Sequence, residues 1–272
     1  MLSLENVVKS FGGVVATNDV SLNFPTGSLS AVIGPNVAGK TTLFNLITGH
    51  LVPDSGRILL QEEDIAGEAP VDIVRKGVGR AFQIASIFPS MTVEQSLMCA
   101  VASHFRSSEA MLSVFPPPDV RRRTEELIEL LGMGAVARLL SANISHGDQK
   151  LLDIGLALAL EPKVLMLDEP TAGMGPEERW QMIGTVRRLW DEGDMTLIFI
   201  EHDMDRVFEV AQQITGLRYG AVLAQGTADE TRKKAQAVAA YLGMDTPAET
   251  QPRPAAGAGP LSATLRHTAI CT

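Results

Sequence analysis

The stretch from Gly34 to Thr42 constrains this chain most. It reads Gly-Pro-Asn-Val-Ala-Gly-Lys-Thr-Thr, which fits the G-x-x-x-x-G-K-T pattern of a loop that surrounds phosphate groups. An apolar run leads into it and a helical pattern of apolar residues follows it. The order strand, loop, helix turns the backbone N–H groups of the loop and of the helix start toward the phosphates. The sequence therefore predicts an α/β fold that binds a nucleoside triphosphate.

Two side chains of this loop have predicted roles beyond the backbone contacts. Lys40 can reach the terminal phosphates as a point charge, and Thr41 can place its hydroxyl on Mg²⁺. A glycine-rich turn without a ligand is the alternative, and the flanking strand and helix favour the phosphate loop. The predicted nucleotide-binding residues of the loop are Gly34, Pro35, Asn36, Val37, Ala38, Gly39, Lys40, Thr41 and Thr42.

A second apolar run, residues 164–167, ends in the carboxylates Asp168 and Glu169. Such a continuous run is typical of a parallel strand buried on both faces, and ligand chemistry in such sheets lies beyond the carboxyl ends of the strands. Asp168 is therefore placed to hold Mg²⁺, directly or through water. Glu169 is placed to orient the attacking water or accept its proton. A capping or surface acid is the alternative, which the phosphate loop disfavours.

A third strand, residues 196–200, ends at Glu201-His202. His202 can donate a hydrogen bond to a γ-phosphate while its other ring nitrogen keeps a protein partner. Taken alone, a histidine that closes a strand is more often an ordinary, satisfied one. Together with the phosphate loop it completes the predicted catalytic set of Lys40, Glu169 and His202.

The segment Ser145-His146-Gly147-Asp148-Gln149 precedes a long apolar helix and lies just upstream of the Asp168 strand. Here the chain resembles an ABC ATPase. The Ser-x-Gly-x-Gln core is similar to the signature motif of that family, whose serine hydroxyl and glycine N–H hold the γ-phosphate bound by the opposite subunit. The resemblance implies nucleotide contacts by Ser145, Gly147 and Gln149.

Further positions follow from the same resemblance. It implies that Phe11 stacks on adenine, that Gln83 senses both Mg²⁺ and the membrane partner, and that Thr171-Ala172-Gly173-Met174 crosses to the other protomer. His202 matches the switch histidine of the family. The predicted metal-binding set is accordingly Thr41, Gln83 and Asp168.

The resemblance covers about residues 1–244 and implies one ABC-type nucleotide-binding domain. We expect an α/β P-loop NTPase (RecA-like) core with an antiparallel β flank and a helical subdomain inserted at about residues 85–159. The remaining residues, 245–272, are rich in Pro, Ala, Gly and Thr and poor in large apolar residues. Such a segment cannot bury enough surface to offset its ordering entropy, so we expect it to be disordered.

Within the family, the Ser-His-Gly, Thr-Ala-Gly-Met-Gly-Pro-Glu-Glu and Phe-Gly-Gly segments are most similar to the ATPase subunits of branched-chain amino-acid importers. The resemblance implies a dimer, with itself or with a related subunit, that sandwiches MgATP. It also implies that hydrolysis drives an integral membrane permease, and indirectly serves a solute-binding protein. The expected solutes are branched-chain amino acids or related amides.

The chain departs from the family pattern at three places. Val37 stands where a third loop glycine is usual, and a β-branched residue there would cost on the order of 1–2 kcal/mol if the backbone needs a positive φ. Met174 replaces an aspartate that many relatives carry in the crossing loop. His146 replaces the commoner glycine of the signature motif.

Charge and hydropathy narrow the function further. The formal charge of −9 and the pI of about 5.1 argue against a nucleic-acid partner, which would require a basic face. No apolar run reaches the length of a membrane span, and the N-terminus lacks a signal-peptide pattern. We therefore expect a peripheral protein on the cytoplasmic face of the membrane. Its two cysteines lack metal-ligand spacing and imply no disulfide.

Three alternatives compete with the importer ATPase. An ABC-type ATPase acting on nucleic acid would carry a long coiled coil between Gln83 and Ser145, and that stretch is too short for one. A small-molecule kinase with the same phosphate loop would leave the Ser145 segment and His202 without a role. The third alternative is a regulatory ABC subunit that only binds ATP, because Val37 weakens its nucleotide site.

Overall fold

In the computed structural model, each predicted catalytic residue follows a strand of one parallel sheet. The structure describes residues 1–82, 87–105, 115–231 and 233. The predictions for Gln83 and for residues 245–272 concern positions outside this range. The described residues up to 233 belong to one compact unit, Met1–Ala235.

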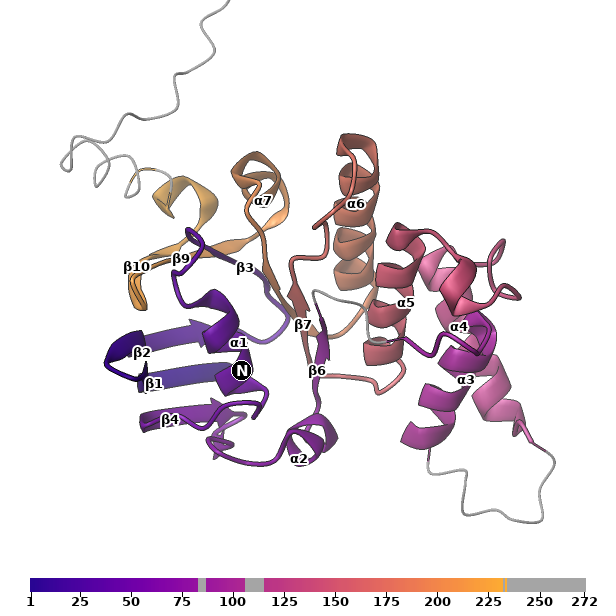
Figure 1. The fold of residues 1–272 in the computed structure, drawn as a ribbon, viewed down its shortest axis with the longest axis horizontal. Coiled ribbons are helices and arrows are strands. Elements are labelled where there is room, and N and C mark those ends of the chain that lie inside the picture. The colour runs from indigo at the N-terminus through magenta and orange to yellow at the C-terminus, as the bar shows by residue number, and fades with distance from the viewer. Residues whose placement is uncertain (83–86, 106–114, 232, 234–272) are drawn as a thin grey trace, which may run out of the picture. The chain divides into compact units, whose positions relative to one another are not determined.

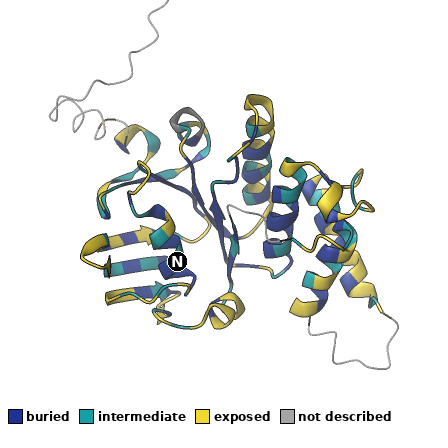
Figure 2. Cartoon of the chain, viewed as in Figure 1, coloured by how far each residue is buried: buried dark blue, intermediate teal, exposed yellow. Residues whose placement is uncertain are grey.

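The main sheet has six strands in the order β10-β9-β3-β8-β7-β6. Its first five in chain order pair in parallel, and β10 is antiparallel to β9. The strands are β3 (Leu29–Ile33), β6 (Val78–Ala81), β7 (Val164–Asp168), β8 (Thr196–Ile200), β9 (Gln213–Arg218) and β10 (Ala221–Gly226). Every residue of β3, β7 and β8 is buried, which explains their predominantly apolar sequence. These strands form the dark centre of Figure 2.

A second sheet is fully antiparallel, in the order β2-β1-β4-β5. Its strands are β1 (Leu2–Phe11), β2 (Val14–Phe24), β4 (Ser55–Leu60) and β5 (Glu63–Asp64). Val20, Leu22 and Phe24 alternate with exposed residues along β2, so one face of this sheet is buried. This is the predicted antiparallel flank.

Helix α1 (Lys40–Ile47) lies between the two sheets (Figure 1). Its buried side chains join one hydrophobic core with the antiparallel sheet and with one face of the parallel sheet, including Met166 and Ile198. The opposite face, including Leu165, Leu167 and Phe199, packs in a second core with helices that follow β6 in the chain. Because neighbouring residues of a strand point to opposite faces of the sheet, the parallel strands contribute side chains to both cores.

Three helices form the inserted subdomain: α3 (Val93–His104), α4 (Pro118–Leu131) and α5 (His146–Leu158). They pack on one another and stand at the side of the sheet that ends in β6 (Figure 1). Local sequence sets their ends: a capping box of Thr92 and Gln95 starts α3, and α4 begins at a proline and stops at Gly132 in the left-handed conformation.

The other helices are α2 (Pro70–Arg75), α6 (Pro176–Glu192) and α7 (Met204–Val210), with a 3₁₀ turn at Ser141–Asn143. Parallel core, antiparallel flank and helical subdomain together confirm the predicted fold class. None of the described helices is both long and apolar enough to cross a lipid bilayer.

Candidate functional site

The phosphate loop joins β3 to α1 in the predicted order, and two glycines make its path possible. A Cβ on Gly34 would lie 2.3 Å from the carbonyl oxygen of Leu217, and one on Gly39 would lie 2.3 Å from that of Ala16. Gly39 also caps α1 in the left-handed conformation, with φ of 95° and no side chain on the helix N-terminus. The N–H groups of the first turn are therefore turned to the loop, as anion binding requires.

Lys40 is folded back over this loop. Its ammonium group donates to the carbonyl oxygens of Gly34 at 2.8 Å and Pro35 at 3.0 Å, and the residue is 5% exposed. Burial lowers the pKa of Lys40, and the nearby carboxylates of Glu169 and Asp168 oppose that shift. Thr41, the next residue, is exposed at the start of α1.

Val37 adopts a positive φ, the backbone conformation that is costly for a β-branched residue. Its φ is +66°, and its side chain is 91% exposed. The valine therefore has a left-handed backbone without packing contacts that could compensate for it.

Asp168 and Glu169 end β7 and face different partners. Asp168 is 3% exposed and bonds through Oδ2 to Nη2 of Arg80 at 2.7 Å. Glu169 has a left-handed backbone, with φ of 50°, and its Oε1 lies 2.6 Å from Nε2 of His202. The structure thus brings together Glu169 and His202, which were predicted from two different strands.

Arg80 was not found by sequence analysis, although a charged residue within the short apolar strand β6 was a usable signal. Its Nη1 donates to Oδ1 of Asn45 at 2.7 Å and to Oγ1 of Thr48 at 3.2 Å, so it links Asp168 to α1. The guanidinium group also lies 4.8 Å from the centre of the Phe82 ring. A buried cation therefore connects the phosphate-loop helix with the end of β7.

The signature segment lies at the N-terminus of α5. Ser145 is the N-cap: its hydroxyl accepts a bond from the backbone N–H of Asp148 at 3.1 Å and donates to Oδ2 of Asp148 at 2.7 Å. Gln149 donates instead to the carbonyl oxygen of Ser141 at 3.3 Å, within its own chain. Ser145 is exposed and Gly147 is half-buried.

The predicted crossing loop packs beside this segment. A Cβ on Gly173 would lie 3.3 Å from Nε2 of His146, and Met174 is 4% exposed. Buried Glu201 holds the loop through one oxygen, Oε1, which accepts bonds from the N–H and the hydroxyl of Thr171. The role of Glu201 was not predicted.

Phe11, the expected adenine partner, lies at the end of β1 and is 45% exposed, with Nζ of Lys9 at 5.6 Å from its ring centre. Gln83 lies outside the described residues. The adjoining Phe82 donates its backbone N–H to Oδ2 of Asp153 at 2.8 Å.

The predicted metal ligands suit Mg²⁺ better than a metal ion that is bound by protein side chains alone. Within the described ranges no group of three His, Cys, Asp or Glu side chains could hold a metal ion. One carboxylate, from Asp168, and one hydroxyl, from Thr41, match the way Mg²⁺ shares its ligands between protein, water and nucleotide phosphates.

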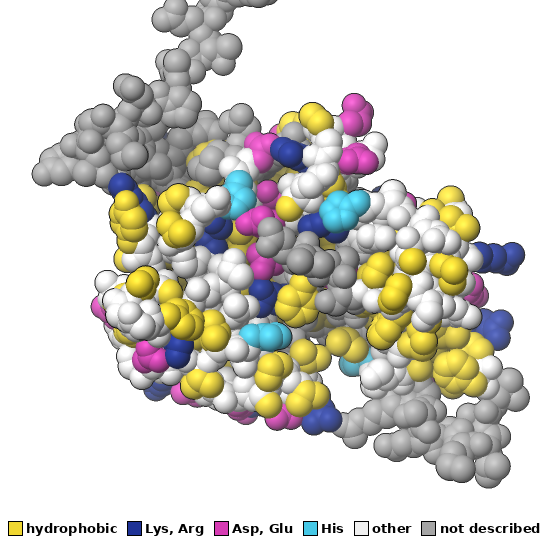
Figure 3. Space-filling model, in the orientation of Figure 1, with side chains coloured by type: hydrophobic (Ala, Val, Ile, Leu, Met, Phe, Trp, Pro, Cys, Tyr) yellow, Lys and Arg dark blue, Asp and Glu magenta, His cyan; other side chains and the backbone are white. Residues whose placement is uncertain are grey.

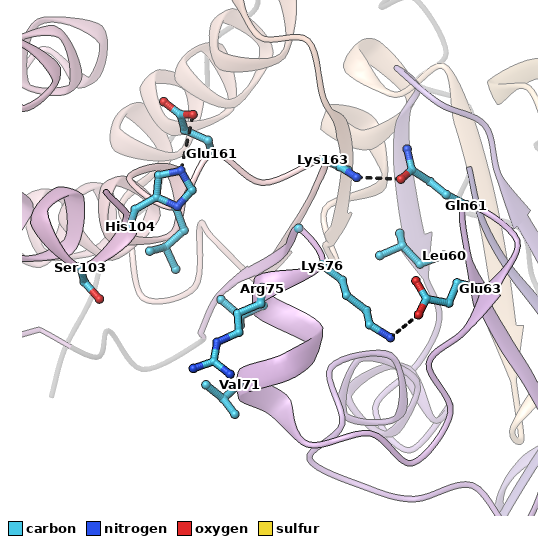
Figure 4. A pocket seen from close by; sticks show the side chains of 13 residues that line it. Leu60, Gln61, Glu63, Val71, Arg75, Lys76, Ser103, His104, Glu161 and Lys163 are labelled. Atoms are coloured by element: carbon cyan, nitrogen blue, oxygen red, sulfur yellow. Dashed lines mark hydrogen bonds and ion pairs between the residues drawn. The ribbon is translucent and has the colours of Figure 1, made fainter. Parts of the chain in front are cut away.

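A separate pocket of about 1090 Å³ lies at the opposite, amino ends of β6 and β7 (Figure 4). Its charged side chains are already paired, as in Lys76 with Glu63 at 2.7 Å and His104 with Glu161 at 3.6 Å. In open α/β sheets ligands bind beyond the carboxyl ends of the strands, so this pocket is distinct from the predicted site.

The fold and the site together define a P-loop nucleoside triphosphatase: a phosphate loop, two carboxylates after a buried strand and a histidine after the next. The family model described as ABC transporter matches residues 17–172, which is more than half of the chain. This chain belongs to the ABC transporter family. It is an ATP-binding subunit of an ABC transporter, and it hydrolyses ATP in coupling to transport.

Named relatives and a solved structure agree. The chain is 35% identical over 251 residues to the high-affinity branched-chain amino acid transport ATP-binding protein LivG of Escherichia coli strain K12, covering 89% of this chain and 98% of that protein. It is 34% identical over 250 residues to BraF of Pseudomonas aeruginosa, of the same description, with the same coverage of 89% and 98%. The ADP conformation of the ATP-binding cassette MJ1267 superposes with a TM-score of 0.76 at 28% identity, covering 89% of this chain and 98% of that one.

Proposed function

We propose that this ATPase powers the uptake of branched-chain amino acids or related amides through a membrane permease, from the cytoplasmic face of the membrane. LivG and BraF, both named for branched-chain amino acid transport, correspond to this chain over nearly their whole length. The solute does not touch this subunit, so its identity rests on these relatives and on the Ser-His-Gly and Thr-Ala-Gly-Met segments.

MgATP is expected to lie between two such subunits, in a homodimer or with a related ATPase. Lys40 and the loop N–H groups of one subunit would hold the phosphates, and Thr41, Asp168 and Gln83 would hold Mg²⁺, which would neutralise phosphate charge when bound. The exposed Ser145 at the N-terminus of α5, together with Gly147, suits a phosphate presented by the second subunit. Phe11 is free to stack on adenine because it is half-exposed at the hairpin end.

Glu169 acts as the general base in this proposal. The observation that carries it is the 2.6 Å contact between Glu169 Oε1 and His202 Nε2, at the carboxyl ends of adjacent strands. A carboxylate so oriented can take the proton of the attacking water, while the imidazole fixes its position.

The permease is expected to dock on the helical subdomain. Figure 3 shows hydrophobic side chains gathered over the helical subdomain, and the exposed large apolar residues in the segments that flank α3 and α4 include Phe88, Leu139 and Leu140. Phe88, just before α3, is 46% exposed, and exposed His50 packs edge-on against Phe82, with ring centres 5.7 Å apart. Such an apolar patch suits a protein partner. A solute-binding protein would act only through the permease.

The test of the base is Glu169→Gln in the purified chain. We expect ATP binding to persist, ATP to hold the dimer together, and turnover to fall by about 100-fold or more, because the amide cannot accept the proton. The matched control is Glu177→Gln, an exposed glutamate at the start of α6, with unchanged turnover. Normal ATP hydrolysis by Glu169→Gln would remove this residue from the mechanism.

The solute is tested in vesicles that contain the reconstituted transporter. ATP-dependent uptake of labelled leucine, isoleucine or valine, or of a short amide, is the expected result. Uptake of none of these, with ATPase activity intact, would contradict the proposed solute class while leaving the ATPase assignment in place.

A further inference from the structure

Glu169 has an unusual backbone for a residue whose side chain must be aimed. Its φ of 50° lies in the left-handed region, which is costly for a residue with a Cβ. Such a conformation persists only when the surrounding structure holds it. The contacts of the Glu169 peptide groups therefore determine where its carboxylate points.

Among the contacts of the described residues, three hydrogen bonds hold this backbone. The N–H of Glu169 donates to the carbonyl oxygen of Ile200 at 3.2 Å. Its own carbonyl oxygen accepts the N–H of Ala172 at 3.1 Å and the ammonium group of Lys150 at 3.0 Å. The first two bonds come from neighbouring loop and strand residues. The third comes from α5, the helix whose N-terminus is the signature segment.

Lys150 is buried, with 3% of its surface exposed. Burying an ammonium group is expensive unless it is paired and hydrogen-bonded, so a lysine at this position needs a reason. Burial lowers its pKa, opposed by the carboxylates of Glu201, Asp153, Glu169 and Asp168. It thus combines a hydrogen bond to the Glu169 carbonyl with a favourable field from the carboxylates around it.

Asp153 lies on the same face of α5, three residues further on, and is 5% exposed. Its Oδ2 accepts the N–H of Phe82, the residue before the expected Mg²⁺ sensor, at 2.8 Å. One helix face therefore holds both the end of β6 and the residue after β7.

We propose that Lys150 is a positioning residue for ATP hydrolysis: from the signature helix, its ammonium group holds the Glu169 peptide in the left-handed conformation that directs the carboxylate to His202. The inference rests on the proposed role of Glu169 as the base. Because Ser145 caps α5, a displacement of the signature segment can reach the base of the same subunit through the hydrogen bond between Lys150 and Glu169.

The experiment compares Lys150→Met, which keeps the length of the side chain without its charge, with Lys150→Arg, which keeps a cationic donor. For Lys150→Met we expect kcat to fall by about 10- to 100-fold, with KM and the Kd for ATP within about twofold of the parent, because a misplaced base affects the chemical step. Lys150→Arg is expected to recover part of kcat. The control, Lys163→Met, removes an exposed ammonium group that donates to Oε1 of Gln61 at 2.7 Å, and is expected to leave kcat unchanged.

A double variant separates positioning from a general loss of structure. In the Glu169→Gln background, Lys150→Met should lower the residual turnover no further, since the group that it positions is gone. A crystal structure of Lys150→Met should show Glu169 out of the left-handed region or away from His202.

Equal losses of kcat in both backgrounds, or a normal kcat for Lys150→Met while Glu169→Gln is inactive, would overturn the positioning role alone. Normal turnover of Glu169→Gln would instead overturn the base. If Lys150→Met does not fold, Lys150→Leu, which likewise has no donor, takes its place with the same expectations.

Discussion

Val37 offers the sharpest test of the physical reasoning, through the substitution Val37→Gly. The residue has a φ of +66° in the phosphate loop, and its side chain is 91% exposed. Removing the side chain therefore relieves the left-handed strain and takes almost no packing away.

The magnitude follows from two opposing contributions. A β-branched residue in the left-handed region costs about 1–2 kcal/mol, which glycine does not incur. Glycine has more conformational entropy than valine in the unfolded chain, which stabilises the unfolded state by about 0.5–1 kcal/mol and opposes the relief of strain. The net stabilisation of Val37→Gly is about 0.5–1 kcal/mol, and the expected rise in Tm is about 1–4 °C for a domain of this size.

The assay is thermal and urea unfolding of the purified chain without nucleotide. Val37→Ala is the control, because it keeps a Cβ at the positive φ and removes only the branch, so its Tm should lie between those of the parent and Val37→Gly. Both variants retain the loop N–H groups, so the Kd for ATP should change by less than about threefold. A Val37→Gly chain that is no more stable than the parent would refute the strain argument.

Two further predictions concern buried charges. Arg80→Met leaves Asp168 buried without its cation, so the free energy of unfolding in urea should fall by about 3–5 kcal/mol. Adding Asp168→Asn should recover part of this loss. Equal stability of Arg80→Met and the parent would show that the ion pair contributes nothing to stability. Burial lowers the pKa of both Lys40 and Lys150. At a pH between these lowered pKa values and the ordinary value of about 10.5, the unfolded state therefore binds more protons than the folded state. The contribution of these two groups to the free energy of unfolding consequently rises with pH in that range. Lys40→Met should reduce that rise in urea unfolding measured from neutral pH to about 10, and an unchanged slope would contradict it.

The sequence predicted those parts of the site whose position is set by a single continuous segment of the chain. The continuous apolar runs before Asp168 and before Glu201 predicted buried parallel strands, and the rule for parallel sheets then placed their carboxyl ends together. The structure confirms the two strands as neighbours, with Asp168 opposite Ile200. The contact between Glu169 and His202 follows from that register, which the apolar pattern alone does not specify.

The parts that the sequence did not predict depend on bonds between distant segments. Arg80 reaches Asp168 across 88 positions, and Lys150 reaches Glu169 across 19. The acceptor of Lys150 is a backbone carbonyl, which has no sequence signature at all. What the sequence does contain is an anomaly: Lys150 and Asp153 have opposite charges at a spacing of three on the face of a helix that is otherwise apolar. Because charged side chains are almost never fully buried without partners, such a pair within a buried helix indicates contacts made elsewhere in the fold. The identity of those contacts needs the three-dimensional arrangement, and here they lead to the predicted base.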